Sequence, residues 1–152
     1  MSDRLPSAPG TYALILRNPG RKTFCVGRLG PVTLPRGWYV YTGSAFGPGG
    51  LAARVGRHLR PDKSKRWHVD YLTSELPVSR IWYTTWRVKQ ECAWAGFLSA
   101  MGGKVHIPGF GASDCNCSAH LFSFPRLPGL TAFRTLCRPT YPVPVIRLPK
   151  RR

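Results

Sequence analysis

The sequence has little negative charge. Its 152 residues include 6 Asp and Glu residues against 23 Lys and Arg residues, which gives a net charge of +17 at pH 7. This imbalance excludes an acidic disordered protein, and like charges of this number repel one another in a compact domain. A polyanionic partner is the usual reason for such a composition, so we expect nucleic acid or an anionic membrane surface.

The sequence also lacks long hydrophobic runs. None approaches the roughly 18 residues that a membrane helix needs, and the first ten residues lack the apolar core of a signal peptide. Heptads and internal repeats are absent too, which excludes a coiled coil or a repeat array. We therefore expect a soluble, cytoplasmic protein, in which the five cysteines are reduced thiols and not a disulfide framework.

The length predicts one domain with a short tail. A hydrophobic fraction of 43% is enough to fill a single core in a chain of 152 residues. Residues 1–138 are expected to form the domain. Residues 139–152 are rich in proline and basic side chains, and we expect them to be disordered, or ordered only on nucleic acid.

Two short β-branched and aromatic runs, residues 11–16 and 23–26, flank the turn signal Asn18-Pro19-Gly20 and predict a β-hairpin. Further strands are predicted at residues 32–34, 37–43, 78–86 and 119–124. Together with the helices below, these strands predict a small α/β (α+β) domain. Its central sheet is expected to be mainly antiparallel and flanked by helices.

An apolar stripe of Leu51, Val55 and Leu59 predicts a helix over residues 51–60, which Pro61 ends. Arg54 and His58 are four residues apart and share another face of that helix. Other helices are predicted at residues 67–72, 88–101 and 130–137.

Two tripeptides stand out once these elements are placed. Gly10-Thr11-Tyr12 opens the first strand, and Tyr41-Thr42-Gly43 closes a later one. A helix with Arg54 and His58 follows, and then a helix with Glu91 in its first turn. This order resembles the GIY-YIG nuclease superfamily, whose two tripeptide strands lie side by side and precede helices with an essential Arg and a metal-binding Glu. Thr replaces Ile in both tripeptides here.

The sequence is most similar to a small branch of that superfamily, a domain of unknown function found alone or attached to endonuclease III-type repair proteins. The resemblance runs from about residue 10 to residue 124. The segments that carry it are residues 37–45, 57–60, 67–72, 91–92 and 109–122.

This resemblance implies a metal-dependent endonuclease acting on DNA, single-stranded or duplex, with a DNA-repair protein as a further partner. It makes Tyr12 the general base, Arg54 the clamp on the scissile phosphate and Glu91 the ligand of Mg²⁺ or Mn²⁺. Tyr41 would hold the water or phosphate, and His58 would orient a phosphate or shuttle a proton. The chemistry agrees, because phosphodiester hydrolysis needs a base, a cation and an acid. These residues are expected on one sheet edge and two helices.

Each of these residues also has a structural interpretation. Tyr12 and Tyr41 could simply pack in their strands, and Glu91 could be an acidic residue favoured by the helix dipole. The superfamily's usual Asn after the Glu-bearing helix has no obvious match. Its candidates are Asn116, Asp114 and His120.

A rival hypothesis uses the positive charge without chemistry, as a non-catalytic module that binds DNA or RNA. The same basic residues in and after the Arg54 helix would contact phosphates in either case. They are Arg57, Arg60, Lys63, Lys65 and Arg66. Close by, His68 and Asp70 either support the active face or pack in their turn.

A second group with metal-ligand character is Cys115, Cys117 and His120, with Cys92 or His106 as further candidates. Thiolates and imidazole suit zinc, which would make the protein a zinc-stabilised adaptor. The spacing is not Cys-x-x-Cys and no second pair follows, so buried free thiols are the preferred interpretation.

Overall fold

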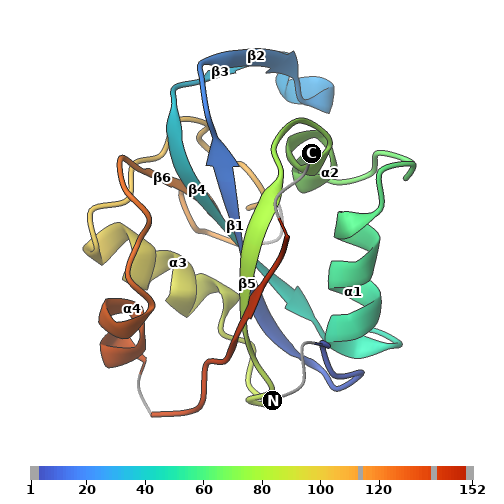
Figure 1. Cartoon of the computed structure of the whole chain (residues 1–152), viewed down its shortest axis with the longest axis vertical. Coiled ribbons are helices and arrows are strands. Elements are labelled where there is room, and N and C mark those ends of the chain that lie inside the picture. The colour runs from blue at the N-terminus through green and yellow to red at the C-terminus, as the bar shows by residue number, and fades with distance from the viewer. Residues whose placement is uncertain (1–3, 113–114, 138–139, 150–152) are drawn as a thin grey trace.

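The computed structural model describes residues 4–112, 115–137 and 140–149. Its centre is a five-stranded antiparallel sheet with strand order β6-β4-β1-β5-β7 (Figure 1). These strands are β1 (Gly10–Asn18), β4 (Gly37–Ala45), β5 (Val78–Thr84), β6 (Leu121–Phe124) and β7 (Val145–Arg147). The predicted α/β class with a mainly antiparallel sheet is confirmed.

The central strand β1 separates two hydrophobic cores. Its alternate residues Tyr12, Leu14 and Leu16 face one core, while Ala13 and Ile15 face the other. This alternation follows from the two-residue period of a strand, in which successive side chains point to opposite faces. Because both faces are covered, every residue of β1 except Arg17 is buried.

Helices cover both faces of the sheet (Figure 1). On the Tyr12 face lie α1 (Gly50–Leu59) and α2 (His68–Glu75), which contribute Leu51, Val55, Val69 and Leu72 to that core. On the other face lie α3 (Glu91–Ala100) and α4 (Leu130–Leu136), with Trp94, Leu98 and Phe133. None of the helices in the described part of the chain is both long enough and apolar enough to cross a membrane.

The hairpin predicted between the first two strands is wrong. Strand β2 (Lys22–Cys25) pairs with β3 (Pro31–Leu34), and the 3-10 helix η1 (Gly27–Leu29) lies between them. Strand β1 pairs with β4 and β5 instead. The physical reason is burial: β1 needs neighbours that bury both of its faces, whereas β2 has no fully buried residue.

The helix predicted over residues 88–101 begins later, at Glu91. Val88 is exposed, and the Gln90 backbone N–H donates a hydrogen bond to Thr11 Oγ1 over 3.0 Å. This bond ties the start of α3 to β1, so that Glu91 is the first residue of its helix and lies close to the tyrosine strands.

The expected disorder of the C-terminal tail is wrong for residues 140–149. Tyr141, Val143 and Ile146 are buried, and β7 pairs with β5 with Ile146 opposite Ile81. The proline-rich segment therefore adds apolar side chains to both cores. The last three residues of the predicted tail, 150–152, lie outside the described residues.

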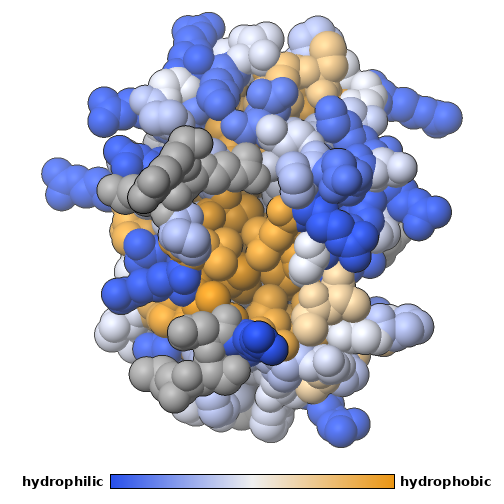
Figure 2. Space-filling view, turned by 45° about the vertical axis from the view of Figure 1, so that its right-hand side comes forward, coloured by the Kyte–Doolittle hydropathy of each residue, from blue (hydrophilic) through white to orange (hydrophobic). Residues whose placement is uncertain are grey.

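One face of the molecule has both hydrophobic and hydrophilic surface. Figure 2 shows hydrophobic side chains gathered in the middle of this face and hydrophilic side chains around them.

Candidate functional site

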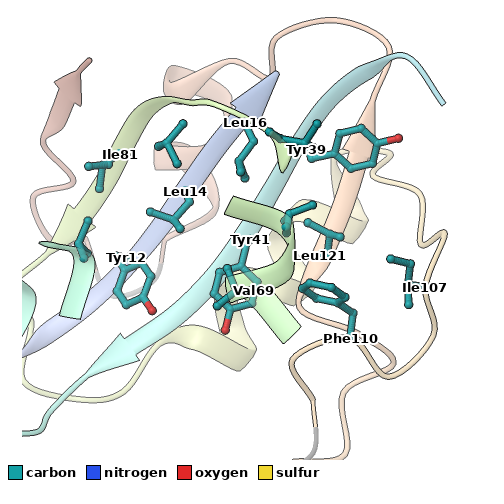
Figure 3. Packing of buried hydrophobic residues seen from close by; sticks show 14 of the residues in the cluster. Tyr12, Leu14, Leu16, Tyr39, Tyr41, Val69, Ile81, Ile107, Phe110 and Leu121 are labelled. Atoms are coloured by element: carbon teal, nitrogen blue, oxygen red, sulfur yellow. The ribbon is translucent and has the colours of Figure 1, made fainter. Parts of the chain in front are cut away.

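Two tyrosines from neighbouring strands lie side by side on the α1 and α2 face of the sheet. Tyr12 comes from β1 and Tyr41 from β4, with ring centroids 6.5 Å apart, and their hydroxyls point in the same direction (Figure 3). Both strands are internal in the sheet. The prediction of a site on a sheet edge is therefore wrong, because β5 and β6 cover the outer sides of this strand pair.

The glycine that closes the second tripeptide makes room for the tyrosine of the first. Tyr12 is opposite Gly43 in the β1–β4 register. A Cβ atom at Gly43 would lie 2.5 Å from Tyr12 Oη, closer than real contacts allow. Steric space for the Tyr12 hydroxyl therefore explains why a glycine stands opposite this tyrosine.

Helix α1 brings His58 to Tyr12. The Tyr12 hydroxyl and His58 Nε2 are 2.7 Å apart, and both side chains are buried. His58 Nδ1, on the other side of the ring, lies 3.8 Å from Asp70 Oδ1 in α2. This arrangement favours a neutral imidazole with its proton on Nδ1, so that the Tyr12 hydroxyl donates to Nε2.

Asp70 is a fully buried carboxylate with several donors. It accepts hydrogen bonds from the Arg57 guanidinium at 2.7 and 3.0 Å, and from the backbone N–H groups of Arg66 and Trp67 at 2.7 and 2.9 Å. Burial opposes ionisation, but the nearby His58 ring and the hydrogen bonds from Arg57 and the two backbone groups outweigh it and hold the pKa of Asp70 far below its ordinary range. Asp70 thus holds the start of α2 and links it to α1 through Arg57, and the same carboxylate lies beside His58.

Burial sets the protonation states of the pair. It raises the pKa of Tyr12 to about 12, although the nearby Arg54 charge acts in the opposite direction. It lowers the pKa of His58 below the ordinary 6.5, against the effect of Asp70. At neutral pH the pair is therefore a neutral phenol hydrogen-bonded to a neutral imidazole, with the imidazole as the stronger base.

A cavity of about 450 Å³ opens beside this pair. Its lining includes Tyr41, Arg54, His58 and Glu91, together with Gly43, beneath which Tyr12 lies. Four of the five predicted catalytic residues thus line one cavity, and the fifth is bonded to one of them. They come from β1, β4, α1 and α3, which only the fold brings together.

The cavity is suited to an anion. Arg54, Arg66 and Lys89 line it, and Glu91 is the one acidic residue among the described residues that do so. The Arg54 guanidinium carbon lies 3.9 Å from the centroid of the Trp67 ring, and its buried Nε has no hydrogen-bond partner in the described part of the chain. A buried cationic donor without a partner is a natural site for a phosphate oxygen.

A second group of chemically active side chains lies at the start of α3. One ligand atom from each member lies within 4.8 Å of all the others, and the members are Cys92, Cys115, Cys117 and His120. This group could hold a metal ion, and thiols suit softer ions than Mg²⁺. The interpretation as buried thiols is wrong for the three cysteines, since Cys92 is exposed and the other two are half-buried.

The remaining sequence candidates lie elsewhere. His106 is hydrogen-bonded to Ser123 Oγ over 2.7 Å and is not a member of the cysteine group. Of the three candidates for the superfamily's Asn, His120 belongs to the cysteine group, Asn116 is exposed, and Asp114 lies outside the described residues. None of the described candidates lines the cavity.

Comparison with known protein families assigns the chain to one of them. A family model described as "Domain of unknown function DUF123" matches residues 11–138. The chain belongs to the DUF123 family. Comparison with curated proteins found no match, and comparison with solved structures found none either. The matched DUF123 segment runs from β1 to α4, so it contains both the cavity and the cysteine group, whereas β7 lies beyond it.

The predicted phosphate-binding residues of this DUF123 domain are not all equally available. Arg57 is paired with Asp70, and Lys63 Nζ donates to the backbone carbonyls of His58 and Arg60. Arg66 lines the cavity, while Arg60 and Lys65 are exposed beyond the end of α1. The last three therefore offer cationic groups to a ligand more directly than Arg57 and Lys63.

Sequence reasoning missed three residues of the candidate site. Trp67 supports Arg54, Lys89 adds charge to the cavity, and Thr42 links β4 to α3 by donating from Oγ1 to the Glu91 carbonyl over 3.2 Å. The position of Thr42 inside the second tripeptide was a signal, because a hydroxyl stands there in place of an aliphatic side chain.

Proposed function

We propose that this protein is a metal-dependent endonuclease that hydrolyses phosphodiester bonds in DNA, in the manner of the GIY-YIG nucleases that its sequence resembles. The observation that carries the proposal is the shared cavity. Tyr41, Arg54, His58 and Glu91 line it, and Tyr12 is bonded to His58 at its wall. Packing alone does not require one carboxylate, one guanidinium and a phenol–imidazole pair to converge on one cavity.

Arg54 is the group that would bind the scissile phosphate. Stacking on Trp67 fixes the plane of its guanidinium, and its Nε is free to donate. A planar guanidinium can donate two parallel hydrogen bonds to phosphate oxygens. Arg66 and Lys89 would hold the neighbouring phosphates of the strand, since both line the same cavity.

Glu91 is the residue that would hold Mg²⁺ or Mn²⁺. One carboxylate fits such an ion, which commonly takes one or two protein carboxylates and completes its shell with water and substrate phosphate. When bound, the ion would stabilise the negative charge that develops on the phosphoryl oxygens. The hydrogen bond from Thr42 to the Glu91 carbonyl fixes the backbone that carries this ligand.

The Tyr12–His58 pair would supply the base. A free phenolate is unfavourable because the pKa of Tyr12 is about 12. The proton can instead move in a relay: the attacking water gives a proton to Tyr12 Oη while the Tyr12 hydroxyl proton passes to His58 Nε2. The Asp70 carboxylate, 3.8 Å from Nδ1, then stabilises the imidazolium.

The test is a cleavage assay on end-labelled single-stranded, duplex and branched DNA, with Mg²⁺, Mn²⁺ or EDTA. We expect metal-dependent cleavage by the wild type and a loss of about 100-fold or more in Glu91→Gln and Tyr12→Phe. Glu75→Gln is the matched control, because Glu75 is an exposed carboxylate that does not line the cavity. It should cleave like the wild type.

DNA binding is measured in parallel by fluorescence anisotropy. Both active-site variants should keep the affinity of the wild type or bind more tightly, because Glu91→Gln removes a negative charge near the phosphate. Tight binding without cleavage of any substrate would contradict the proposal. That result would favour a non-catalytic nucleic-acid-binding module.

A further inference from the structure

The cysteine group beside α3 has the composition of a closed metal site. Cys92 contributes from the first turn of α3, and Cys115, Cys117 and His120 contribute from the loop before β6. The four ligand atoms lie within 4.8 Å of one another. Around a tetrahedral Zn²⁺ with Zn–S bonds of about 2.3 Å, neighbouring sulfurs stand roughly 3.8 Å apart, so a small contraction would close the shell.

His120 is already oriented as a ligand. Its Nε2 faces the sulfurs, 3.1 Å from Cys115 Sγ and 4.0 Å from Cys92 Sγ. Its Nδ1 lies 2.8 Å from Thr42 Oγ1 on β4. Because Thr42 Oγ1 gives its own proton to the Glu91 carbonyl, Nδ1 must donate to Thr42, which leaves the Nε2 lone pair directed at the cysteines. Metal-binding histidines are commonly fixed by such an outer hydrogen bond.

We propose that Cys92, Cys115, Cys117 and His120 bind one structural Zn²⁺ that fixes Glu91 to β4. All four ligands come from the protein, so this ion has no open position for water or substrate and is separate from the catalytic cation. Binding releases three protons, one from each thiol, and leaves three thiolates and one neutral imidazole around the ion. The role assigned to Glu91 rests on the proposed function, but the zinc site itself does not.

The position of the site explains why zinc would matter to the cavity. Cys92 follows Glu91 directly, and Thr42 stands between Tyr41 and Gly43. A chain of contacts therefore runs from the ion through His120 and Thr42 to the Glu91 backbone. The segment between α3 and β6 contains no helix or strand. A tetrahedral centre would therefore fix this segment to the start of α3 and to the second tripeptide.

The primary test is the metal content of the full-length chain, purified under reducing conditions without chelator and measured by inductively coupled plasma mass spectrometry. We expect one zinc per chain in the wild type and less than a tenth of that in Cys115→Ser and Cys117→Ser. Cys25→Ser is the control, because Cys25 is an exposed thiol outside the group, and it should keep its zinc.

A second measurement covers the case in which the variants fail to fold. Wild-type protein is stripped of metal and titrated with Co²⁺, whose visible and near-ultraviolet bands report tetrahedral coordination by thiolates. Thr42→Val should weaken metal binding about 10- to 100-fold, and Thr42→Ser, which keeps the hydroxyl, should restore it.

Two outcomes would overturn the zinc site: folded, reduced wild type with no zinc and no tetrahedral Co²⁺ spectrum, or a disulfide between two members of the group in the freshly purified protein. None of these measurements uses DNA. The zinc site can therefore fail while cleavage is observed, and it can stand if the protein proves inactive.

Discussion

The Tyr12 hydroxyl occupies the space that a side chain at Gly43 would fill. The two residues are opposite each other in the β1–β4 register, and a Cβ at Gly43 would lie 2.5 Å from Tyr12 Oη. A glycine is therefore needed on β4 wherever a tyrosine on β1 must reach His58. The two tripeptides form one steric unit, and the cavity depends on both.

Gly43→Ala should impair the proposed DNA cleavage while keeping the fold. The methyl group must displace the Tyr12 ring and break its bond to His58, so we expect at least a 10-fold drop in kcat and a loss of about 1–3 kcal/mol in stability. Gly47→Ala is the matched control: Gly47 also lines the cavity, but a Cβ there has no neighbour within 4 Å. Equal activity of both variants would contradict this account.

The pH dependence of cleavage should report His58. Because burial lowers its pKa, the base form persists at neutral pH, and kcat/KM should fall only as the pH drops below 6.5. Tyr12, with a pKa of about 12, adds no inflection below pH 10. Asp70 raises the pKa of His58, so Asp70→Asn should move the acid limb to lower pH. If the acid limb of the pH profile does not move in this variant, Asp70 does not influence the pKa of the catalytic base.

Asp70→Asn should also destabilise the domain. It leaves Arg57 and two backbone N–H groups with fewer acceptors at a fully buried site, which costs about 3 kcal/mol at pH 7 by urea denaturation. The folded-state pKa of Asp70 is depressed, so its contribution is present above the unfolded pKa of about 4 and declines below it. The difference between wild type and variant should therefore shrink in acid. Asp62→Asn, at an exposed carboxylate, should change little at either pH.

Trp67→Leu should weaken catalysis through Arg54. The ring lies 3.9 Å from the Arg54 guanidinium carbon, and loss of about 1–2 kcal/mol of cation–π attraction predicts roughly a 5- to 30-fold fall in kcat/KM. Trp38→Leu is the control, since Trp38 stacks with Arg17 outside the cavity. If both variants cleave alike, Trp67 does not position Arg54.

Ile146→Ala should destabilise the protein by about 2 kcal/mol in denaturant unfolding, because Ile146 is a buried residue of β7. Arg147→Ala, the next position and exposed, should leave the midpoint within about 0.5 kcal/mol of the wild type. If Ile146→Ala had no effect, the C-terminal segment would not be part of the core in solution.

The elements that were predictable are those with a strong local pattern. The apolar stripe of Leu51, Val55 and Leu59 placed α1 to within one residue, and four-residue spacing put Arg54 and His58 together. The pairing of β1 with the next strand was predicted wrongly, because a local turn signal at Asn18 suggested a hairpin that burial of β1 rules out. The resemblance, in contrast, implied that the two tripeptide strands lie side by side, and β1 and β4 do so. The residue spacing that marks a helix is a local property of the sequence. The partner of a β-strand, in contrast, depends on which other strands and helices bury both of its faces.

The candidate site divides in the same way. Tyr12, Tyr41 and Glu91 were identified through the resemblance; Tyr41 and Glu91 line the cavity, and Tyr12 is bonded to His58 in its wall. The role of Asp70 remained open, because its partners Arg57 and His58 belong to another helix. The participation of Cys92 with Cys117 depends on the three-dimensional path of a loop, and no spacing rule supplies that path.

Strand β7, a short edge strand, pairs with β5 and consists of residues beyond the matched family segment. Without it, β5 would present a row of unpaired N–H and C=O groups, which is a template for joining other chains edge to edge. A fragment that stops at residue 138 would therefore aggregate even though it holds every candidate catalytic residue. The proline-rich segment thus protects β5 from pairing with other chains, in addition to its part in the core.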